Sequence, residues 1–324
     1  MRSFRHISAR TTEEACELLA EYKGKAVLNA GGTDLLLSLK GENLFNYPEL
    51  IIDIKTIPNL DYIREDKNTL SIGALTKLSN ISDHPLINKR YLMLGEAARS
   101  VATPQIRNVA TIGGNLCQDV RCWYYRYPGH IGGPIRCMRK GNGPCPAVAG
   151  DNRYHAIMGG KKCFAVCPSD IATALAALDS RILVTGIKGA RKIALKDFFN
   201  PLGKTLSPDE MVVGLETKKT SATARQKFLK FTLRKPVDFA IVSVATVVYL
   251  EKNICTDAHI ALGAVAPGPV RAIKAEEFLK GKVINSENIS TAANEALSMA
   301  RPLSRNAYKL EIAKALVKRS LSGD

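Results

Sequence analysis

Two pairs of glycines in this chain could hold an anionic group through backbone amides. Each pair lies in a short run that also carries polar side chains: Asn29, Ala30, Gly31, Gly32, Thr33, Asp34 and Leu35 in the first, and Thr111, Ile112, Gly113, Gly114 and Asn115 in the second. Glycine has no side chain that would keep a phosphate away from the amides. A single such loop is more often an ordinary tight turn, but two of them suggest the two phosphates of a dinucleotide.

The better-known phosphate-binding motifs are missing from the sequence. Neither glycine pair is followed by a Walker lysine, and there is no G-x-G-x-x-G run. These features count against a P-loop ATPase and against a Rossmann dehydrogenase.

Cysteine is the second residue type whose distribution could do chemistry. Six of the eight cysteines lie between residues 117 and 167, whereas Cys16 and Cys255 stand alone and are expected to be structural. Residues 120–162 are rich in glycine, proline, arginine and aromatic residues and show no period of 2 or 3.6. Such a segment cannot bury a core of its own. Four thiolates converging on one metal centre could supply the missing stabilisation.

The formal net charge of +16 allows several kinds of partner. A basic chain can bind nucleic acid, an acidic membrane surface, an acidic subunit or a soluble electron carrier. The basic residues concentrate in residues 121–162 and 301–319, without the interleaved aromatic platforms that single-strand binding uses. We therefore expect no nucleic-acid binding.

The sequence predicts neither a membrane span nor an export signal. Its longest apolar run, residues 240–250, is about 11 residues long, and a helix needs roughly 20 to cross a bilayer. The first residues are basic but lack an apolar stretch and a cleavage site, which predicts a cytoplasmic protein. In that compartment cysteines are more often reduced thiols or metal ligands than disulfides.

Local patterns predict a mixture of helices and strands. A helix capped by Thr11, with Glu14 reaching back to the Thr11 amide, is expected first. Residues 103–116 contain Pro104 and a glycine pair and are predicted to form a structured loop, and residues 221–226 a linker. Further helices are predicted at 86–98, 170–178, 286–300 and 303–321, and strands at 25–28, 50–54, 62–64, 70–72, 181–185, 228–233, 240–250 and 259–265.

Both glycine runs, together with Gln105, Ile106, Arg107 and Asn108 ahead of the second, resemble the FAD-binding subunit of the xanthine dehydrogenase and carbon monoxide dehydrogenase family. The resemblance extends along almost the whole chain. Pro168, Ser169 and Asp170 resemble the loop whose aspartate binds FAD, and Lys230, Arg234 and Asp238 repeat the family's K-x-x-x-R-x-x-x-D spacing. The resemblance implies that Lys230 and Val212 lie near the flavin ring. The FAD-binding residues it implies are Asn29, Ala30, Gly31, Gly32, Thr33, Asp34, Leu35, Thr111, Gly114, Asn115, Asp170, Val212 and Lys230.

The same resemblance implies an α+β fold of the vanillyl-alcohol-oxidase/CO dehydrogenase flavoprotein type. An FAD-binding domain, residues 1–220, would consist of two lobes at about 1–56 and 57–220, with FAD between them. A cysteine-rich insertion would occupy about residues 120–167 of the second lobe. A CO dehydrogenase flavoprotein-like α+β domain would follow at residues 221–324.

The cysteine-rich insertion resembles that of the flavoprotein (β) subunit of 4-hydroxybenzoyl-CoA reductase, which holds a 4Fe-4S cluster. That resemblance implies Cys122, Cys137, Cys145 and Cys163 as the cluster ligands. The interval from Cys145 to Cys163 is longer than expected, so Cys167 is the reserve candidate. Zinc is the rival metal, although the segment lacks the paired C-x-x-C of tetrathiolate zinc sites. Two loop histidines, His130 and His155, are expected to be solvent-exposed or hydrogen-bonded rather than metal ligands.

The family resemblance implies an FAD- and 4Fe-4S-containing electron-transfer subunit of a heterotrimeric molybdenum hydroxylase-type oxidoreductase. Its partners would be a 2Fe-2S subunit and a molybdopterin-binding large subunit, assembled as a dimer of heterotrimers, with ferredoxin as a further partner. Two alternatives remain open. One is the flavin subunit of a xanthine or aromatic hydroxylase that uses NAD as acceptor, and the other is a non-redox scaffold that holds structural zinc.

Overall fold

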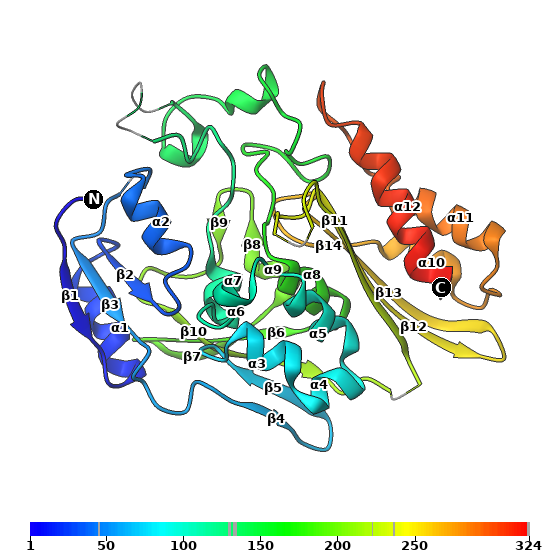
Figure 1. Ribbon diagram of the computed structural model, residues 1–324, viewed down its shortest axis with the longest axis horizontal. Coiled ribbons are helices and arrows are strands. Elements are labelled where there is room, and N and C mark those ends of the chain that lie inside the picture. Colours follow the sequence, from blue (N-terminus) through cyan, green and yellow to red (C-terminus); the bar gives the residue numbers. More distant parts are fainter. Residues whose placement is uncertain (45, 129–130, 132–134, 222, 236, 323–324) are drawn as a thin grey trace.

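The computed structural model describes residues 1–44, 46–128, 131, 135–221, 223–235 and 237–322. Figure 1 shows a small lobe at the N-terminus, a larger central lobe, a C-terminal domain beside it, and an irregular segment that arches over all three. None of the helices in the described part of the chain is long and apolar enough to cross a bilayer.

The first lobe is a small parallel sheet covered by helices. Its strand order is β1-β3-β2, formed by β1 (Arg5–Ser8), β2 (Ala26–Asn29) and β3 (Leu50–Asp53). Between β1 and β2 lies α1 (Thr12–Glu21), and between β2 and β3 lies α2 (Leu35–Lys40). All four residues of β3 are buried, as expected for the central strand of a parallel sheet. The first glycine run therefore forms the turn between β2 and α2.

The second lobe is an antiparallel sheet of order β4-β5-β10-β6-β7. Its strands are β4 (Ile63–Glu65), β5 (Thr69–Gly73), β6 (Arg181–Gly186), β7 (Gly189–Ala194) and β10 (Met211–Lys218), and a short hairpin joins β8 (Phe199–Asn200) to β9 (Gly203–Lys204). The helices of this lobe are α3 (Leu78–Asp83), α4 (Pro85–Arg90), α5 (Leu92–Arg99), α6 (Pro104–Arg107), α7 (Ile112–Cys117), α8 (Asp170–Ala177) and α9 (Leu195–Phe198). The eight residues of α8 are all buried, so this helix lies at the centre of the molecule.

The C-terminal domain packs helices against one antiparallel sheet. The sheet has the order β11-β12-β13-β14 and consists of β11 (Arg225–Phe231), β12 (Val242–Glu251), β13 (Ile254–Gly263) and β14 (Val270–Arg271). Its helices are α10 (Ile273–Leu279), α11 (Ser286–Glu295) and α12 (Tyr308–Ser322). The central helix α8 packs against β12 and β13, and α5 packs against β11. The second lobe and the C-terminal domain thus share a continuous contact.

The cysteine-rich segment between α7 and α8 contains almost no regular structure. Its described residues form two 3-10 turns, η1 (Met138–Lys140) and η2 (Pro146–Val148). This agrees with the absence of any period in its sequence.

Several details of the predicted elements are wrong. The predicted helix at 86–98 is divided at Tyr91 into α4 and α5, the predicted helix at 286–300 ends at Glu295, and β11 begins at Arg225, inside the predicted linker.

Residues 103–116 hold two short helices, because Thr103 and Thr111 cap α6 and α7 through their hydroxyl oxygens, which accept from Ile106 N and Gly114 N. The cap of α1 also differs. Thr11 Oγ1 accepts from Glu14 N as expected, but the Glu14 carboxylate accepts from Arg10 N, at 2.7 Å, rather than from Thr11 N.

Candidate functional site

The two glycine runs meet in space. Gly31 packs so closely on the second run that a Cβ there would collide with the carbonyl oxygen of Val109 and lie 2.9 Å from the Cα of Ala110. Val109 and Ala110 directly precede Thr111. The first loop therefore touches the start of the second loop, as two halves of one dinucleotide cradle require.

The backbone and side chains of this cradle leave room and polarity for a ligand. Gly32 has a φ of +69°, which glycine adopts without strain. Beside it, Asn29 Oδ1 is buried and finds no hydrogen-bond donor among the described residues. A buried acceptor of this kind is costly unless a ligand or water supplies a donor. Gly114 faces open space apart from the hydroxyl of Thr111. These features fit a bound dinucleotide.

The second glycine run is joined to the loop before α8. Ser169 Oγ donates to Asn115 Oδ1 at 2.6 Å and also caps α8 by accepting from Ala172 N. Thr111, predicted to bind FAD, uses its hydroxyl oxygen as the cap of α7. The side chains of Thr111 and Asn115 thus shape the cradle from within the protein.

Asp170 and Lys230 form a buried ion pair below this junction. Lys230 Nζ lies 2.7 Å from Asp170 Oδ2 and also donates to Ser100 O at 3.0 Å. Only 8% of the Lys230 side chain and 5% of the Asp170 side chain are exposed. Burial raises the pKa of Asp170, although the Lys230 ammonium acts against that rise. The two residues come from α8 and β11, so the pair joins the second lobe to the C-terminal domain.

Val212 lies on β10, where the pairing with β6 shifts register between Val212 and Gly214. Its side chain is buried in the core of the second lobe, while the neighbouring Val213 is partly exposed and packs against the first lobe. A contact between Val212 and the flavin ring stays a prediction.

Asp34 is bonded to the cysteine-rich segment instead of standing free in the cradle. Its carboxylate accepts from Asp119 N at 2.7 Å, from Arg126 Nη2 at 2.7 Å, and from Arg121 Nη1. Burial opposes ionisation of Asp34, but the guanidinium groups of Arg121 and Arg126 outweigh it and hold its pKa below the ordinary range. The first glycine loop is therefore hydrogen-bonded to the start of the cysteine-rich segment.

Three of the four predicted cluster ligands lie in one small apolar cluster. Cys122, Cys137 and Cys163 pack with Val120, Tyr125 and Ala165. Burial raises the pKa of the Cys122 thiol to about 11, the amides of Tyr125 and Tyr124 oppose that rise, and Cys163 and Cys145 add to it. Cys145 is thus close enough to interact electrostatically with Cys122. Soft thiolates in apolar surroundings are the donor set that iron–sulfur clusters use.

The reserve candidate, Cys167, lies elsewhere. It belongs to the core of the second lobe, next to α8, and burial raises its pKa to about 11. Cys117, at the end of α7, is exposed. In the part of the chain that the structure describes, no three or more His, Cys, Asp or Glu side chains lie close enough together to hold a single metal ion.

His155 is hydrogen-bonded to a predicted ligand. Its Nε2 lies 3.3 Å from Cys122 Sγ, and only 3% of the residue is exposed. Burial lowers the pKa of His155 to about 4, with a further contribution from the Lys309 ammonium. His130 lies outside the described residues.

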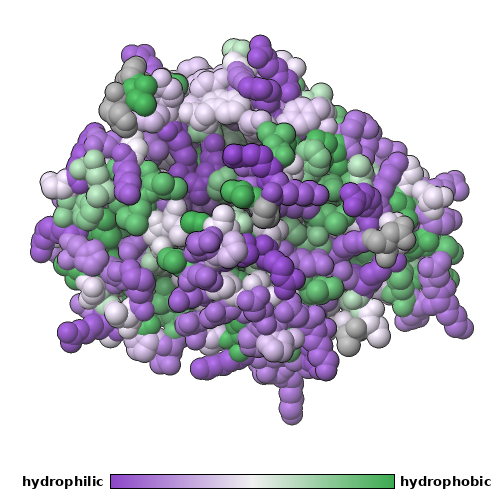
Figure 2. Space-filling view, in the orientation of Figure 1, coloured by the Kyte–Doolittle hydropathy of each residue, from purple (hydrophilic) through white to green (hydrophobic). Residues whose placement is uncertain are grey.

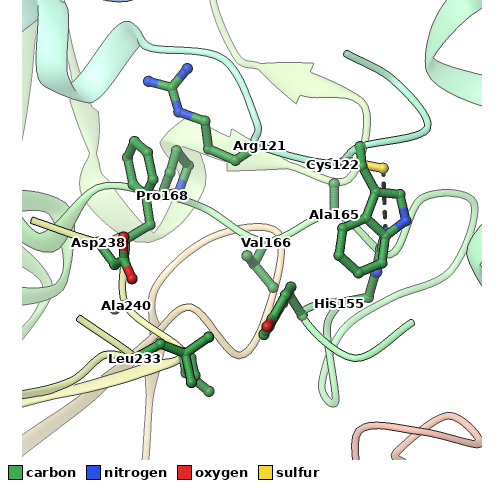
Figure 3. Close-up of a pocket in the computed structure, with 13 residues that line it drawn as sticks. Arg121, Cys122, His155, Ala165, Val166, Pro168, Leu233, Asp238 and Ala240 are labelled. Carbon is green, nitrogen blue, oxygen red and sulfur yellow. Dashed lines mark hydrogen bonds between the residues drawn. The ribbon is translucent and has the colours of Figure 1, made fainter. Parts of the chain in front are cut away.

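A largely apolar cavity of about 260 Å³ separates the cysteine cluster from the loop that follows β11. Figure 3 shows Cys122 and His155 on one side of it and Leu233, Asp238 and Ala240 on the other. The Arg121 guanidinium stacks 4.6 Å above the Phe239 ring at this boundary. Figure 2 shows that the surface is hollowed beneath the cysteine-rich segment. The cavity is lined by Arg121, Cys122, Trp123, Tyr154, His155, Ala165, Val166, Pro168, Leu233, Asp238, Phe239, Ala240 and Ile241.

Sequence reasoning missed a second anchor of the insertion, formed by α12 and the residues just before it. Lys309 is fully buried and donates to His155 O at 3.1 Å and to Ala264 O at 2.6 Å. Asn306 Nδ2 donates to the carbonyls of His155 and Ala156. A helical period would have shown Lys309 on the buried face of α12, together with Ala313, Leu316, Val317 and Ser320.

Comparison with known proteins places this chain among flavoproteins. Residues 2–217 match the family described as "FAD binding domain in molybdopterin dehydrogenase", and residues 227–323 match the "CO dehydrogenase flavoprotein C-terminal domain". The aldehyde oxidoreductase FAD-binding subunit PaoB of Escherichia coli is 32% identical, covering 97% of this chain and 96% of that protein. The nicotinate dehydrogenase FAD-subunit of Eubacterium barkeri is 28% identical, covering 98% and 95%.

A solved structure shows the same fold. Carbon monoxide dehydrogenase from Hydrogenophaga pseudoflava superimposes with a TM-score of 0.78 at 28% identity, covering 99% of this chain and 97% of that one. The match confirms the predicted α+β fold of the CO dehydrogenase flavoprotein type with a C-terminal domain. The chain belongs to the family of FAD-binding flavoprotein subunits of molybdopterin dehydrogenases and is an oxidoreductase component.

Proposed function

We propose that this chain carries FAD and a 4Fe-4S cluster and passes electrons between an external carrier and the 2Fe-2S and molybdenum subunits of its enzyme, in the manner of 4-hydroxybenzoyl-CoA reductase. The observation that carries the proposal is the position of the cysteine cluster. It lies across one cavity from the loop that follows Lys230, and it is tied to the first flavin loop through Asp34.

The FAD part of the proposal rests on three features. They are the cradle formed by the two glycine loops, the buried Asn29 Oδ1 that has no hydrogen-bond donor among the described residues, and the buried Asp170–Lys230 pair. When bound, FAD supplies both two-electron and one-electron chemistry. This chain's residues hold and orient it. Gly31, Gly32 and Gly114 would let the backbone approach the pyrophosphate, and Lys230, held by its ion pair with Asp170, would lie close to the ring. We assign the remaining FAD-binding residues as the sequence predicted them.

The cluster half rests on the grouping of thiols. Cys122, Cys137 and Cys163 share one apolar cluster, whereas Cys167 is built into a different core. We therefore assign the fourth ligand to Cys163. Thiolates from an irregular loop also explain how residues 120–167 keep a shape with so little secondary structure.

Partners follow from the names of the relatives. Both curated relatives are FAD subunits of larger enzymes, and the solved relative is an enzyme whose cofactor contains molybdenum. We propose that this chain likewise assembles with a 2Fe-2S subunit and a molybdopterin-binding large subunit, as a dimer of heterotrimers. Exposed basic residues surround the cysteine segment and favour an acidic soluble electron carrier such as ferredoxin: Arg136, Arg153, Lys161, Lys162, Arg301 and Arg305.

The test is anaerobic purification of the chain with its partner subunits, followed by measurement of flavin, iron, sulfide and zinc. We expect FAD together with about four iron and four sulfide per chain beyond those of the 2Fe-2S subunit. Electron paramagnetic resonance of the reduced complex should show an additional cluster signal. Zinc without flavin or iron would overturn the proposal in favour of a scaffold. Rapid flavin reduction by NADH, without the extra iron, would favour the NAD-linked alternative.

Serine substitutions then assign the ligands. Cys122→Ser, Cys137→Ser, Cys145→Ser and Cys163→Ser are each expected to remove the additional signal. Cys167→Ser and Cys255→Ser are the matched controls and should retain it. Loss of the signal in Cys167→Ser, with retention in Cys163→Ser, would exchange the fourth ligand.

A further inference from the structure

The sulfur of Cys122 contacts one side-chain nitrogen. His155 Nε2 lies 3.3 Å from Sγ. The dashed line in Figure 3 marks this contact beside the cavity. A sulfur that receives an N–H group is suited to carry negative charge.

The backbone of His155 is held on both sides of its Cα. The His155 carbonyl accepts from Lys309 Nζ at 3.1 Å and from Asn306 Nδ2 at 3.2 Å, and the His155 amide donates to Asn152 O at 2.9 Å. The ring packs edge-on against Trp123, with centroids 5.6 Å apart, and lies 5.9 Å from Tyr124. Lys309 belongs to α12 of the C-terminal domain, and Asn306 lies just before that helix. The histidine therefore meets the sulfur in a fixed geometry.

We infer that His155 is a positioning residue that donates an N–H···S hydrogen bond to Cys122 and thereby raises the reduction potential of the cluster. The inference rests on the proposed function, because it takes Cys122 to be a cluster ligand. A reduced cluster carries one more negative charge than an oxidised one, and a donor to the ligand sulfur stabilises the more negative state. The bond to sulfur uses the Nε2 proton, so the neutral ring offers Nδ1 as an acceptor.

Two substitutions separate the hydrogen bond from the bulk of the ring. His155→Leu fills part of the space without a donor, whereas His155→Gln places an amide N–H near the position of Nε2. Tyr154→Leu is the matched control, because Tyr154 packs on Trp123 in the same cavity, whereas the nitrogen beside Cys122 Sγ belongs to His155. Each variant is purified anaerobically as the full complex, and the cluster and flavin are titrated together by spectroelectrochemistry and electron paramagnetic resonance.

The expected result is a lower cluster potential in His155→Leu, with iron content and flavin potential unchanged. His155→Gln should recover most of the shift, and Tyr154→Leu should show almost none. An unshifted potential in His155→Leu, at full iron content, would overturn the inference. So would selective loss of the extra iron in both histidine variants, since that outcome would make His155 a ligand. If the unaltered complex contains no extra iron, it is the proposed function that fails, not the hydrogen bond.

A second measurement needs no variant. In the unaltered complex labelled with nitrogen-15 histidine, pulsed electron–nuclear double resonance of the reduced cluster should detect a weak coupling to one imidazole nitrogen. A strong coupling would indicate direct ligation, and the absence of coupling would remove the bond. Both outcomes contradict the inference even if His155→Leu fails to fold.

Discussion

At the scale of single residues, the Asp34 carboxylate joins the first glycine loop to the cysteine-rich segment. It has two guanidinium partners and one amide partner, and the Asp34 side chain is 17% exposed. Removing one partner of a largely buried ion pair leaves the other charges without compensation. Asp34 therefore contributes to stability as well as to the shape of the cradle.

Asp34→Asn is expected to lower the free energy of unfolding by about 2–3 kcal/mol at neutral pH. Because the folded-state pKa of Asp34 is depressed, this contribution is present above the ordinary aspartate pKa of about 4 and is lost as pH falls through the lower folded value. Thermal unfolding followed by circular dichroism between pH 3 and 8 checks this. Asp238→Asn, in the exposed pair with Arg234, is the control and should change stability by less than about 0.5 kcal/mol. Equal losses in the two variants would contradict the prediction.

Lys309 gives a pH dependence of the same sign in a different, alkaline window. Burial lowers its pKa to about 7, so the unfolded chain binds more protons than the folded one between about pH 7 and 10.5. Stability relative to Lys309→Met should therefore rise over that window, by at most about 1.4 kcal/mol per pH unit. Denaturant unfolding at several pH values measures the difference. Lys314→Met, on the exposed side of α12, should give curves parallel to those of the unaltered protein. A flat difference for Lys309→Met would show that the lysine stays charged when folded.

At the scale of elements, the close approach of the two glycine loops is the feature most open to test. Gly31→Ala places a methyl group against the Val109 carbonyl, and overpacking of this kind costs about 1–3 kcal/mol. If the loops separate to relieve it, FAD binding weakens by roughly tenfold to a hundredfold. Flavin content after gel filtration and a fluorescence titration with added FAD measure the change.

Gly203→Ala on β9 is the matched control for that change, because its Cβ would meet nothing closer than Asn200 Oδ1 at 4.0 Å. It should retain its flavin. Full FAD affinity in Gly31→Ala would mean that the loops need not touch to bind the dinucleotide.

Elements with strong local signals were predictable from the sequence. The Thr11 cap of α1, the hairpin of β4 and β5, and the long apolar strand β12 all follow from local residue patterns and are confirmed. The helices α6 and α7 were not predictable in the same way. Pro104 occupies the first turn of α6, where it breaks no hydrogen bond. Gly113 lies inside α7 because a Cβ there would sit 2.9 Å from the backbone oxygen of Ala74. Both residues are ordinarily helix breakers, so the sequence pattern indicated a loop although Thr103 and Thr111 cap the two helices.

The candidate site, too, was only partly predictable from the sequence. The two glycine pairs, interpreted as sites for the two phosphates of one dinucleotide, predicted that their loops would meet. The side-chain hydrogen bonds of Asp34 and of the buried Lys309 join residues 45 or more positions apart, and nothing local in the sequence encodes such pairs. Arg121 and Arg126 likewise pair with a distant group, the Asp34 carboxylate on the first lobe.

At the scale of the whole molecule, exposed basic side chains lie on the face that carries the cysteine-rich segment. The exposed lysines and arginines named above lie along residues 136–162 and 301–305, which the hydrogen bonds of Asn152, Asn306 and Lys309 bring together. A basic surface around a redox centre speeds the encounter with an acidic carrier.

The paired change Lys161→Glu and Lys162→Glu is therefore expected to slow reduction of the complex by an acidic ferredoxin several-fold at low salt. The difference should shrink above about 0.1 M salt, where the Debye length falls below about 10 Å. Stopped-flow reduction at several ionic strengths measures both effects. Lys67→Glu with Lys218→Glu, exposed at the β4–β5 edge, makes the same charge change elsewhere and should leave the rate unaltered. Equal slowing in both pairs would indicate an effect of net charge alone.

The bond between Asp34 and the two insertion arginines also bears on how a cell would build this protein. The Asp34 carboxylate links the cysteine-rich segment to the first glycine loop. A shortage of iron should therefore also lower the flavin content of the protein. Cultures starved of iron are expected to yield a chain that has lost yellow colour as well as brown. In that case the proposed iron–sulfur cluster would be inserted first, and FAD would be retained only afterwards.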